Sequence, residues 1–210
     1  MSVAVVCCTL GGYDAPEGLP EQTVPYQSTY ISDEHAMSWS GHRDAHPRLL
    51  AKVPKCRPDL YTNTEVNIWI DGSFRVKSPR FVEWCLEQLG AADLAMFRHP
   101  HRNGIIAEAE ASRQMSKYQG HPVQDQATSY IARGFQGTPG LWATGLIVSR
   151  PTKRIRQLGD AWLREQLRWT WQDQISLPPL LEELDIEPVA LDGALVGNHL
   201  FDIRAHRRED

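Results

Sequence analysis

Residues 66–73 read Val-Asn-Ile-Trp-Ile-Asp-Gly-Ser. β-Branched and aromatic residues dominate positions 66–70, and this composition favours a buried β-strand. Gly72 follows Asp71 directly, and an Asp-Gly pair is a turn signal, so we expect the strand to end there. The sequence therefore predicts a carboxylate, that of Asp71, at the carboxyl end of a buried strand.

Further strands and helices alternate on both sides of this stretch. Apolar runs predict strands at 3–10, 26–31, 93–98, 141–148 and 189–191. Apolar residues at helical spacing and start and stop signals predict helices at 48–57, 79–90, 104–118, 122–133, 153–169 and 173–184. Pro54 and Pro58 should limit the first helix, and Pro178-Pro179 should interrupt the last one.

This alternation predicts an α/β sandwich with a mostly parallel central sheet. We expect one domain over residues 1–210. Residues 195–210 should form an irregular tail that can fold over the site.

The bulk composition limits the classes of protein to which the chain can belong. It has 210 residues, of which 41% are apolar, which is enough for one domain with a core. A net charge of −4 argues against nucleic acid as a partner. Without a run of about 18 apolar residues, no membrane span is expected. The four cysteines form no C-x-x-C motif, so we expect free thiols and a cytoplasmic location.

Ligands of open α/β sheets bind beyond the carboxyl ends of the strands. This rule selects four segments, 9–14, 71–73, 99–102 and 142–145. In the second of them, Asp71 is well placed to bind a divalent metal that holds a diphosphate, since magnesium and manganese prefer oxygen ligands. An Asp that only caps the turn is the structural alternative.

A second candidate segment is Trp171-Gln172-Asp173-Gln174. Aromatic rings beside polar groups suit a sugar, whose C–H faces stack on the rings. Asp173 and Gln174 are therefore candidate catalytic residues next to Trp171. Alternatively, Asp173 is the N-cap of the following helix, and this capping role is compatible with a catalytic one.

Polar residues also follow the strand at 93–98. His99 and His101 form a His-x-His pair that can bind a metal, and Arg102 suits a phosphate or a carboxylate. A solvated loop is the alternative. On the next helix, two glutamates lie two positions apart on different faces, so at most one of them faces the site. We choose Glu108, which lies nearer the helix start.

Four segments occur together in an order typical of one protein family. They are Thr9-Leu-Gly-Gly-Tyr13-Asp14, Trp69-Ile-Asp71-Gly72-Ser73, His99-Pro100-His101-Arg102 with Glu108, and Trp142-Ala-Thr-Gly145 followed by Trp171-Gln-Asp173-Gln174. In this order they resemble the TOD1/MUCI70 glycosyltransferase-like domain family, and they span most of the chain.

The resemblance implies a GT-A-like, Rossmann-like sandwich that moves a sugar from a nucleotide-sugar donor, such as a UDP sugar, to an acceptor hydroxyl. It also implies a divalent metal, Mn²⁺ or Mg²⁺, at Asp71. Ser73 stands where the usual D-x-D motif has its second Asp, so its hydroxyl or a tail histidine, His206, is expected to complete the site. A surface histidine is the simpler interpretation of His206.

The same resemblance assigns the remaining roles. It places the nucleoside near Thr9, Tyr13 and Asp14, and the diphosphate near Lys52 and Arg102. The expected sugar and acceptor side consists of His99, His101, Trp142, Thr144, Gly145 and Trp171.

For the chemistry, Asp173 is the general base if the reaction inverts, or positions the sugar if it retains. Gln174 and Glu108 are expected to assist it. The acceptor is a glycan, a protein or a small molecule.

Two other classes of function stay open at this point. A metal-dependent hydrolase could use Asp71, His99 and His101 around a water molecule. A non-catalytic protein could bind a nucleotide or a sugar without turnover.

Overall fold

The computed structural model describes residues 1–15, 17–39, 45–137 and 140–207. Within them, six strands form one sheet in the order β2-β1-β3-β6-β5-β7. All strands of this sheet run in one direction except β6, which pairs antiparallel with both of its neighbours. The strands are β1 (Val3–Cys8), β2 (Gln27–Ile31), β3 (Val66–Ile70), β5 (Leu94–Arg98), β6 (Trp142–Ser149) and β7 (Val189–Ala190). The predicted α/β sandwich with a mostly parallel sheet is confirmed.

The reversed strand β6 affects where the functional segments lie. Because β6 runs against the others, its first residues lie at the edge where β1, β3 and β5 end. Segment 142–145 therefore joins segments 9–14, 71–73 and 99–102 at one edge of the sheet. A strand running parallel to the others would have placed its start at the opposite edge.

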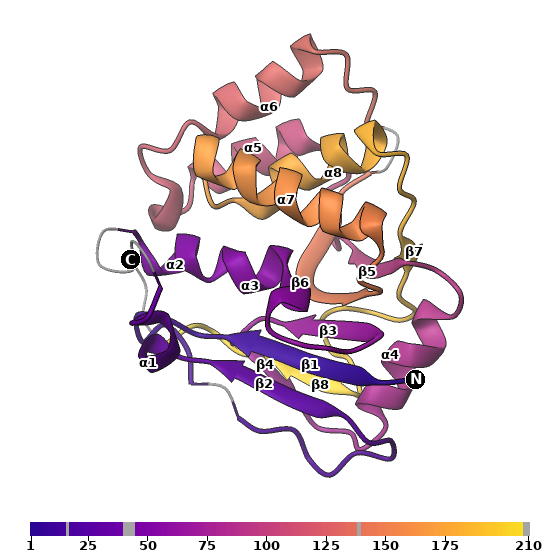
Figure 1. Ribbon diagram of the computed structural model, residues 1–210. Helices are drawn as coiled ribbons and strands as arrows, with labels where there is room; N and C mark the ends of the chain where they lie inside the picture. The colour runs from indigo at the N-terminus through magenta and orange to yellow at the C-terminus, as the bar shows by residue number, and fades with distance from the viewer. Residues whose placement is uncertain (16, 40–44, 138–139, 208–210) are drawn as a thin grey trace.

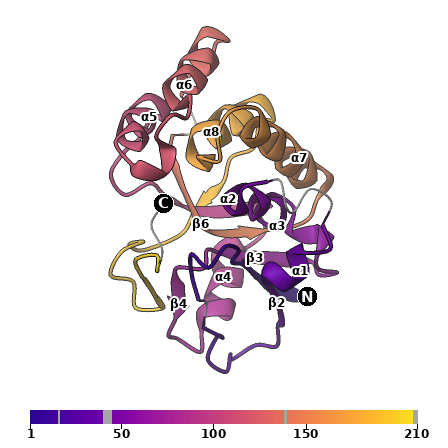
Figure 2. The ribbon, with the colours of Figure 1, turned by 90° about the vertical axis from the view of Figure 1, so that its left-hand side faces the viewer.

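Helices cover both faces of the sheet, in the layers visible in Figures 1 and 2. One face packs against α3, α7 and α8, and α5 and α6 pack on α8. The other face packs against α4 and a small second sheet. The helices of these layers are α3 (Lys52–Cys56), α4 (Phe81–Leu89), α5 (Ile105–Arg113), α6 (Val123–Ala132), α7 (Lys153–Arg168) and α8 (Asp173–Glu183).

Strand β1 contributes to both cores, because successive side chains of a strand point to opposite faces. Val5 and Cys7 lie in the core under α4, whereas Val6 and Cys8 lie in the core under α7. The two adjacent cysteines therefore lie in different cores.

Short helices lie in the connections between these elements. Helix α1 (Asp33–Ala36) follows β2, and a 3-10 helix, η1 (Pro58–Leu60), follows α3. The helix predicted at 104–118 ends at Arg113, and a separate 3-10 helix, η2 (Ser116–Tyr118), follows it.

The prolines act differently from the prediction. The helix expected at 48–57 is divided into α2 (Pro47–Leu50) and α3, and Pro54 lies inside the first turn of α3, where its missing N–H costs little. Pro178 and Pro179 lie inside α8 without ending it. The buried apolar side chains of α8 hold it in both core clusters, and this packing outweighs the two lost hydrogen bonds.

The tail is not wholly irregular, which corrects the prediction for 195–210. Within its described part, β8 (Phe201–Ile203) pairs antiparallel with β4 (Phe74–Val76), the strand that directly follows the Asp71 turn. The described tail returns to the carboxyl edge of the main sheet, where the Arg207 N–H donates to the Tyr13 carbonyl. In the described part of the chain, every helix is too short or too polar to cross a lipid bilayer.

Candidate functional site

One cleft, with a volume of about 350 Å³, lies where β1, β3 and β5 end and β6 begins. Nearly all residues predicted for the site line it. They are Thr9, Tyr13, Asp14, Lys52, Asp71, Ser73, His99, Arg102, Glu108, Thr144, Gly145, Trp171, Asp173, Gln174 and His206. Segments that are far apart in the sequence thus meet in one place, as the strand-end rule predicts.

Asp71 lies at the floor of this cleft with its carboxylate divided between two environments. Its Oδ1 accepts hydrogen bonds from Trp69 Nε1 at 2.7 Å and from Lys55 Nζ at 3.1 Å. Its Oδ2 has no hydrogen-bond partner among the described residues, and a Cβ on Gly145 would lie 3.5 Å from it. The missing side chain at Gly145 therefore leaves space beside a carboxylate oxygen.

The glycine after Asp71 is required by close packing. A Cβ on Gly72 would lie 2.3 Å from Thr9 Cγ2 and 2.9 Å from Asp14 Cβ. Only glycine lets the loop after β1 approach the end of β3 this closely. Thr9 and Asp14 are brought beside Asp71 as a result.

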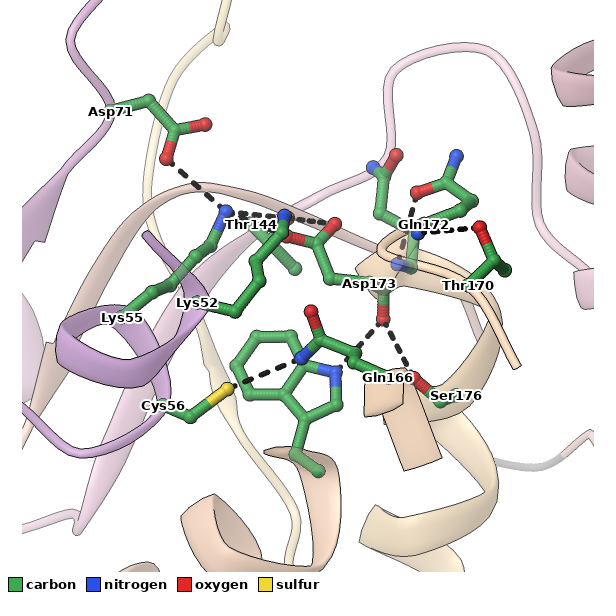
Figure 3. A network of polar contacts seen from close by, with 12 residues as sticks. Lys52, Lys55, Cys56, Asp71, Thr144, Gln166, Thr170, Gln172, Asp173 and Ser176 are labelled. Atoms are coloured by element: carbon green, nitrogen blue, oxygen red, sulfur yellow. Dashed lines mark hydrogen bonds and ion pairs between the residues drawn. The ribbon is translucent and has the colours of Figure 1, made fainter. Parts of the chain in front are cut away.

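Asp173 is enclosed by cations (Figure 3). Its Oδ2 lies 2.7 Å from Lys52 Nζ and 2.7 Å from Lys55 Nζ, and its Oδ1 accepts a hydrogen bond of 2.9 Å from the Thr144 hydroxyl. The side chains of Lys55 and Asp173 are 4% and 7% exposed. Lys55 thus bridges Asp71 and Asp173 as a buried ammonium group.

These contacts fix the charge states of the buried pair. Burial would raise the pKa of Asp173, but the charges of Lys52 and Lys55 outweigh it and hold that pKa well below its usual range. Burial would lower the pKa of Lys55, but the charges of Asp173 and Asp71 outweigh it and raise that pKa. Both groups are therefore charged at neutral pH.

The two lysines owe their position to the packing of α3 on α7. A Cβ on Gly159 of α7 would lie only 2.1 Å from the Cys56 carbonyl oxygen at the end of α3, so the helices touch backbone to backbone there. Gln166 Nε2 also donates to Cys56 Sγ at 3.2 Å. Lys52 and Lys55 lie three residues apart on one face of this clamped helix.

Glu108 forms the centre of a second buried network. Its side chain is 1% exposed and pairs with the Arg102 guanidinium. Its Oε1 accepts hydrogen bonds from Gln172 Nε2 at 2.7 Å and from Ser112 at 3.3 Å. The carboxylate is fully engaged and holds Arg102 at the cleft wall.

His99 belongs to the same network as an acceptor. Its Nδ1 accepts the backbone N–H groups of His101 and Arg102 at 3.2 and 3.0 Å. Burial and the positive charges of Arg102 and His101 lower the pKa of His99 to about 4. The Glu108 carboxylate lies 3.6 Å from its Nε2 but is neutralised by Arg102, so His99 is neutral at physiological pH.

Two predicted residues do not line the cleft. His101 is exposed at the surface. Trp142 is 1% exposed and belongs to the core, where the Arg98 guanidinium covers its ring at 3.8 Å. The structure therefore does not place a Trp142 ring where a sugar could stack.

The loop after β1 meets the tail at the other side of the cleft. Asp14 accepts from His206 Nδ1, with distances of 2.9 and 3.0 Å to its two oxygens. The Tyr13 carbonyl accepts the Arg207 N–H at 2.9 Å, and the Arg48 guanidinium lies 4.2 Å from the centre of the Tyr13 ring. The described tail thus folds back onto the cleft.

Trp171 lies at the wall with histidines on two sides. The His46 ring stacks on it at 4.5 Å, and the His121 ring approaches edge-on at 4.1 Å. Gln172, rather than Asp173, is the N-cap of α8, since its side chain accepts the Gln174 N–H. Asp173 is the first residue of the helix, and the capping alternative does not apply to it.

No three His, Cys, Asp or Glu side chains of the described residues gather closely enough to hold a metal on their own. This arrangement does not favour the hydrolase alternative, which needed Asp71, His99 and His101 around one ion. It remains compatible with an ion that shares its ligands with a phosphate, because magnesium commonly binds through one or two carboxylates plus substrate phosphates.

Several cleft residues were missed by sequence reasoning about the site. They are Arg48, Lys55, Lys117 and Gln172. The spacing of Lys52 and Lys55 was a usable signal, since residues three apart share a helix face. The sequence contains no comparable signal for Lys117, because the position of this residue depends on how η2 packs against α5.

Residues 41–191 match the family model described as TOD1/MUCI70, glycosyltransferase-like domain. Among solved structures, glucosyl-3-phosphoglycerate synthase from Mycobacterium tuberculosis, in complex with Mn²⁺, uridine diphosphate and glucosyl-3-phosphoglycerate, is similar over 100% of this chain and 73% of that chain, at 14% identity and a TM-score of 0.45. Mouse xyloside xylosyltransferase 1, in its apo form, is similar over 80% of this chain and 63% of that chain, at 12% identity and a TM-score of 0.41.

No curated protein matches the sequence. The family match covers well over half of the sequence and includes Asp71, Asp173 and the lysines of α3. The chain therefore belongs to the TOD1/MUCI70 family of glycosyltransferase-like enzymes.

Proposed function

We propose that this protein transfers a sugar from a nucleotide-sugar donor, expected to be a UDP sugar, to an acceptor hydroxyl with the help of a divalent metal ion. The observation that carries the proposal is the meeting of Asp71, Asp173, Lys52 and Lys55 in one cleft at the carboxyl edge of the sheet. A departing nucleoside diphosphate needs positive charge placed in advance at the site of bond cleavage.

The donor set at Asp71 fits a metal held jointly with the diphosphate. Asp71 Oδ2 faces the space left by Gly145. His206, which is hydrogen-bonded through Nδ1 to the Asp14 that lies beside Gly72, is the second candidate ligand. A divalent ion bound there would supply Lewis-acid stabilisation of the charge on the leaving diphosphate.

The two lysines are proposed to have different electrostatic roles because they differ in burial. Lys52 is 15% exposed and can turn toward a phosphate, whereas Lys55 is held between two carboxylates and supplies a fixed charge. Arg102, positioned by Glu108, adds a cation from the segment that follows β5. Glu108 thus acts in this proposal as a positioning residue for Arg102.

Asp173 is proposed to organise these cations. Both of its oxygens are engaged, and its low pKa makes it a weak proton acceptor. It holds Lys52 and Lys55 beside the diphosphate, and its backbone carbonyl fixes Trp162 through a hydrogen bond of 3.0 Å. Gln174, whose amide donates to the Trp142 carbonyl at 3.2 Å, lines the acceptor side.

The roles of the remaining cleft residues are proposed from their positions along the cleft. Thr9, Tyr13 and Asp14 are proposed for the nucleoside, and Ser73 for the metal or diphosphate. Thr144, Gly145, Trp171 and His99 are proposed for the sugar and the acceptor. The Trp171 ring already carries His46 on one face, so a sugar would contact its edge or its other face.

All four cysteines are free and buried. Free thiols persist in reducing compartments, which supports the expected cytoplasmic location.

The proposal is tested by thermal unfolding of the protein with nucleoside diphosphates and nucleotide sugars, each with and without manganese. A specific donor at a hundredfold excess over its Kd should stabilise the fold by about 2.7 kcal/mol. The manganese-dependent part of this shift should disappear in Asp71→Asn and persist in the matched surface variant Asp192→Asn, whose side chain is exposed. An equal manganese effect in D71N would overturn the metal assignment.

Turnover separates an enzyme from a binding protein. A donor that binds should be hydrolysed slowly to free sugar and nucleoside diphosphate, and faster in the presence of an accepted hydroxyl compound. Binding of every nucleotide sugar without release of nucleoside diphosphate, over many hours and with a broad acceptor panel, would identify a non-catalytic protein.

A further inference from the structure

One cation on the cleft wall lacks a carboxylate partner. Lys117 lies in η2, lines the cleft and is half-buried, with its Nζ 4.9 Å from the centre of the Tyr118 ring. No carboxylate of the described residues lies within ion-pairing distance of it. By contrast, Lys52 and Lys55 pair with Asp173, and Arg102 pairs with Glu108.

Positive charges near Lys117 make its half-buried ammonium group still less favourable. Arg48 and Lys52 line the same cleft. Burial and the positive charges of Arg48 and Lys52 lower the pKa of Lys117. A half-buried ammonium group without a directly paired carboxylate is unfavourable, and a bound anion would relieve that cost.

General basicity does not account for this feature. The chain has a net charge of −4, so positive charge gathers at this part of the cleft against the overall balance. Lys52, Lys55 and Arg102 are already paired with protein carboxylates. The charge of Lys117 is thus available for a ligand.

The position of Lys117 indicates which ligand it would meet. It belongs to the wall formed by η2 and the start of α8, where Tyr118 packs with Ile175 and Trp171 in one core cluster. The proposed nucleoside contacts lie instead in the loop after β1. The proposed diphosphate contacts lie around Asp71, on α3 and at Arg102.

We infer that Lys117 forms an anion subsite for the acceptor, which would carry a phosphate or a carboxylate beside the hydroxyl that receives the sugar. The inference rests on the proposed function. A sugar phosphate, a polyol phosphate or a uronic acid has this chemistry. A neutral sugar would leave the ammonium group unmatched, whereas an anion forms a charge-assisted hydrogen bond with it.

The test compares glycerol 3-phosphate with glycerol as probes, by calorimetry on protein saturated with uridine diphosphate and manganese. The variant is Lys117→Gln, and the matched control is Lys153→Gln, an exposed lysine at the start of α7. Wild type and K153Q should bind glycerol 3-phosphate at least about tenfold more tightly than K117Q. Glycerol should distinguish none of the three, and all three should bind uridine diphosphate equally.

Two results would overturn the inference. In one, glycerol 3-phosphate fails to bind wild type at millimolar concentration or binds K117Q equally well. In the other, K117Q weakens uridine diphosphate and leaves glycerol 3-phosphate unchanged, which assigns the ammonium group to the donor. If no nucleotide binds any protein, the proposed function fails, and the phosphate comparison is then made without nucleotide, where the same tenfold loss in K117Q still identifies the anion site.

Discussion

Replacing Lys55 with methionine should destabilise the protein far more than the same change at Lys52. Both ammonium groups lie 2.7 Å from the same oxygen of Asp173. They differ in burial, since Lys55 is 4% exposed and Lys52 is 15% exposed. They also differ in partners, since Lys55 additionally holds Asp71 at 3.1 Å. Methionine keeps an unbranched apolar side chain, one atom shorter than that of lysine, and removes the ammonium group with its hydrogen bonds.

The magnitude follows from what each variant leaves behind. Removing one partner of a buried ion pair costs roughly 3–5 kcal/mol, because the other charge stays buried without compensation. Lys55→Met leaves Asp173 with Lys52 and leaves Asp71 half-exposed to water, so we expect the low end, about 3 kcal/mol. Lys52→Met leaves Asp173 with Lys55 and Thr144, and we expect about 1 kcal/mol.

The pH range of the effect can be derived from the two pKa shifts. The pKa of Lys55 is raised in the folded state, so its contribution is complete below its unfolded value and is lost as pH rises through the folded value. The pKa of Asp173 is lowered, so its contribution is complete above its unfolded value and is lost as pH falls through the folded value. The difference between wild type and K55M should therefore be constant from about pH 5 to 9.

Urea unfolding at pH 7 measures both variants, with thermal unfolding as a second readout. For a chain of this size, about 3 kcal/mol corresponds to a loss of about 6–12 °C in Tm. If K55M is as stable as K52M, Lys55 is not a buried bridge between the two carboxylates. A difference that changes strongly between pH 6 and 8 would equally refute the assignment, because neither partner titrates there.

Three further outcomes test other parts of the site. Gly159→Ala should destabilise the fold by about 2 kcal/mol or more in urea unfolding, because the added Cβ would lie 2.1 Å from the Cys56 carbonyl oxygen. The control Gly18→Ala, which has open space at its Cβ, should change the stability little. Glu108→Gln should cost about 2 kcal/mol, since it leaves the neighbouring guanidinium without its counter-charge, and a wild-type unfolding curve would refute this. The pKa of His99 is about 4 in the folded protein and 6.5 ordinarily, so the stability that this residue contributes is present above pH 6.5 and is lost as pH falls toward 4. In His99→Gln, the free energy of unfolding measured in urea should therefore depend less on pH over that range.

Local signals in the sequence predicted the strands and their ends well. The strand at 66–70 has the predicted bounds, because a continuous apolar run followed by Asp-Gly is complete within a few residues. Segment 142–145 was placed correctly although the reversed direction of β6 was not predicted. Its apolar run marks a strand, but strand direction depends on which neighbours it pairs with.

Features that depend on distant packing could not be read from the sequence. Strand β8 pairs with β4 across more than a hundred residues, and both are too short to show a period. The double proline at 178–179 is a strong local break signal, yet burial of Ile175, Leu177 and Leu181 keeps α8 continuous. In both cases tertiary contacts outweigh local preference.

The role of Asp173 illustrates why a residue can be predicted when its chemistry cannot. The affinity of a carboxylate for a proton depends on the number of cations beside it. Asp173 with Thr144 alone would be an ordinary acid, but two ammonium groups from a helix far earlier in the chain make it a poor base. Those groups reach it only because α3 lies backbone to backbone on α7, where Gly159 has no side chain. A glycine without chemistry of its own therefore determines whether this aspartate can accept a proton, and G159A should raise the pKa of Asp173 if α3 moves away.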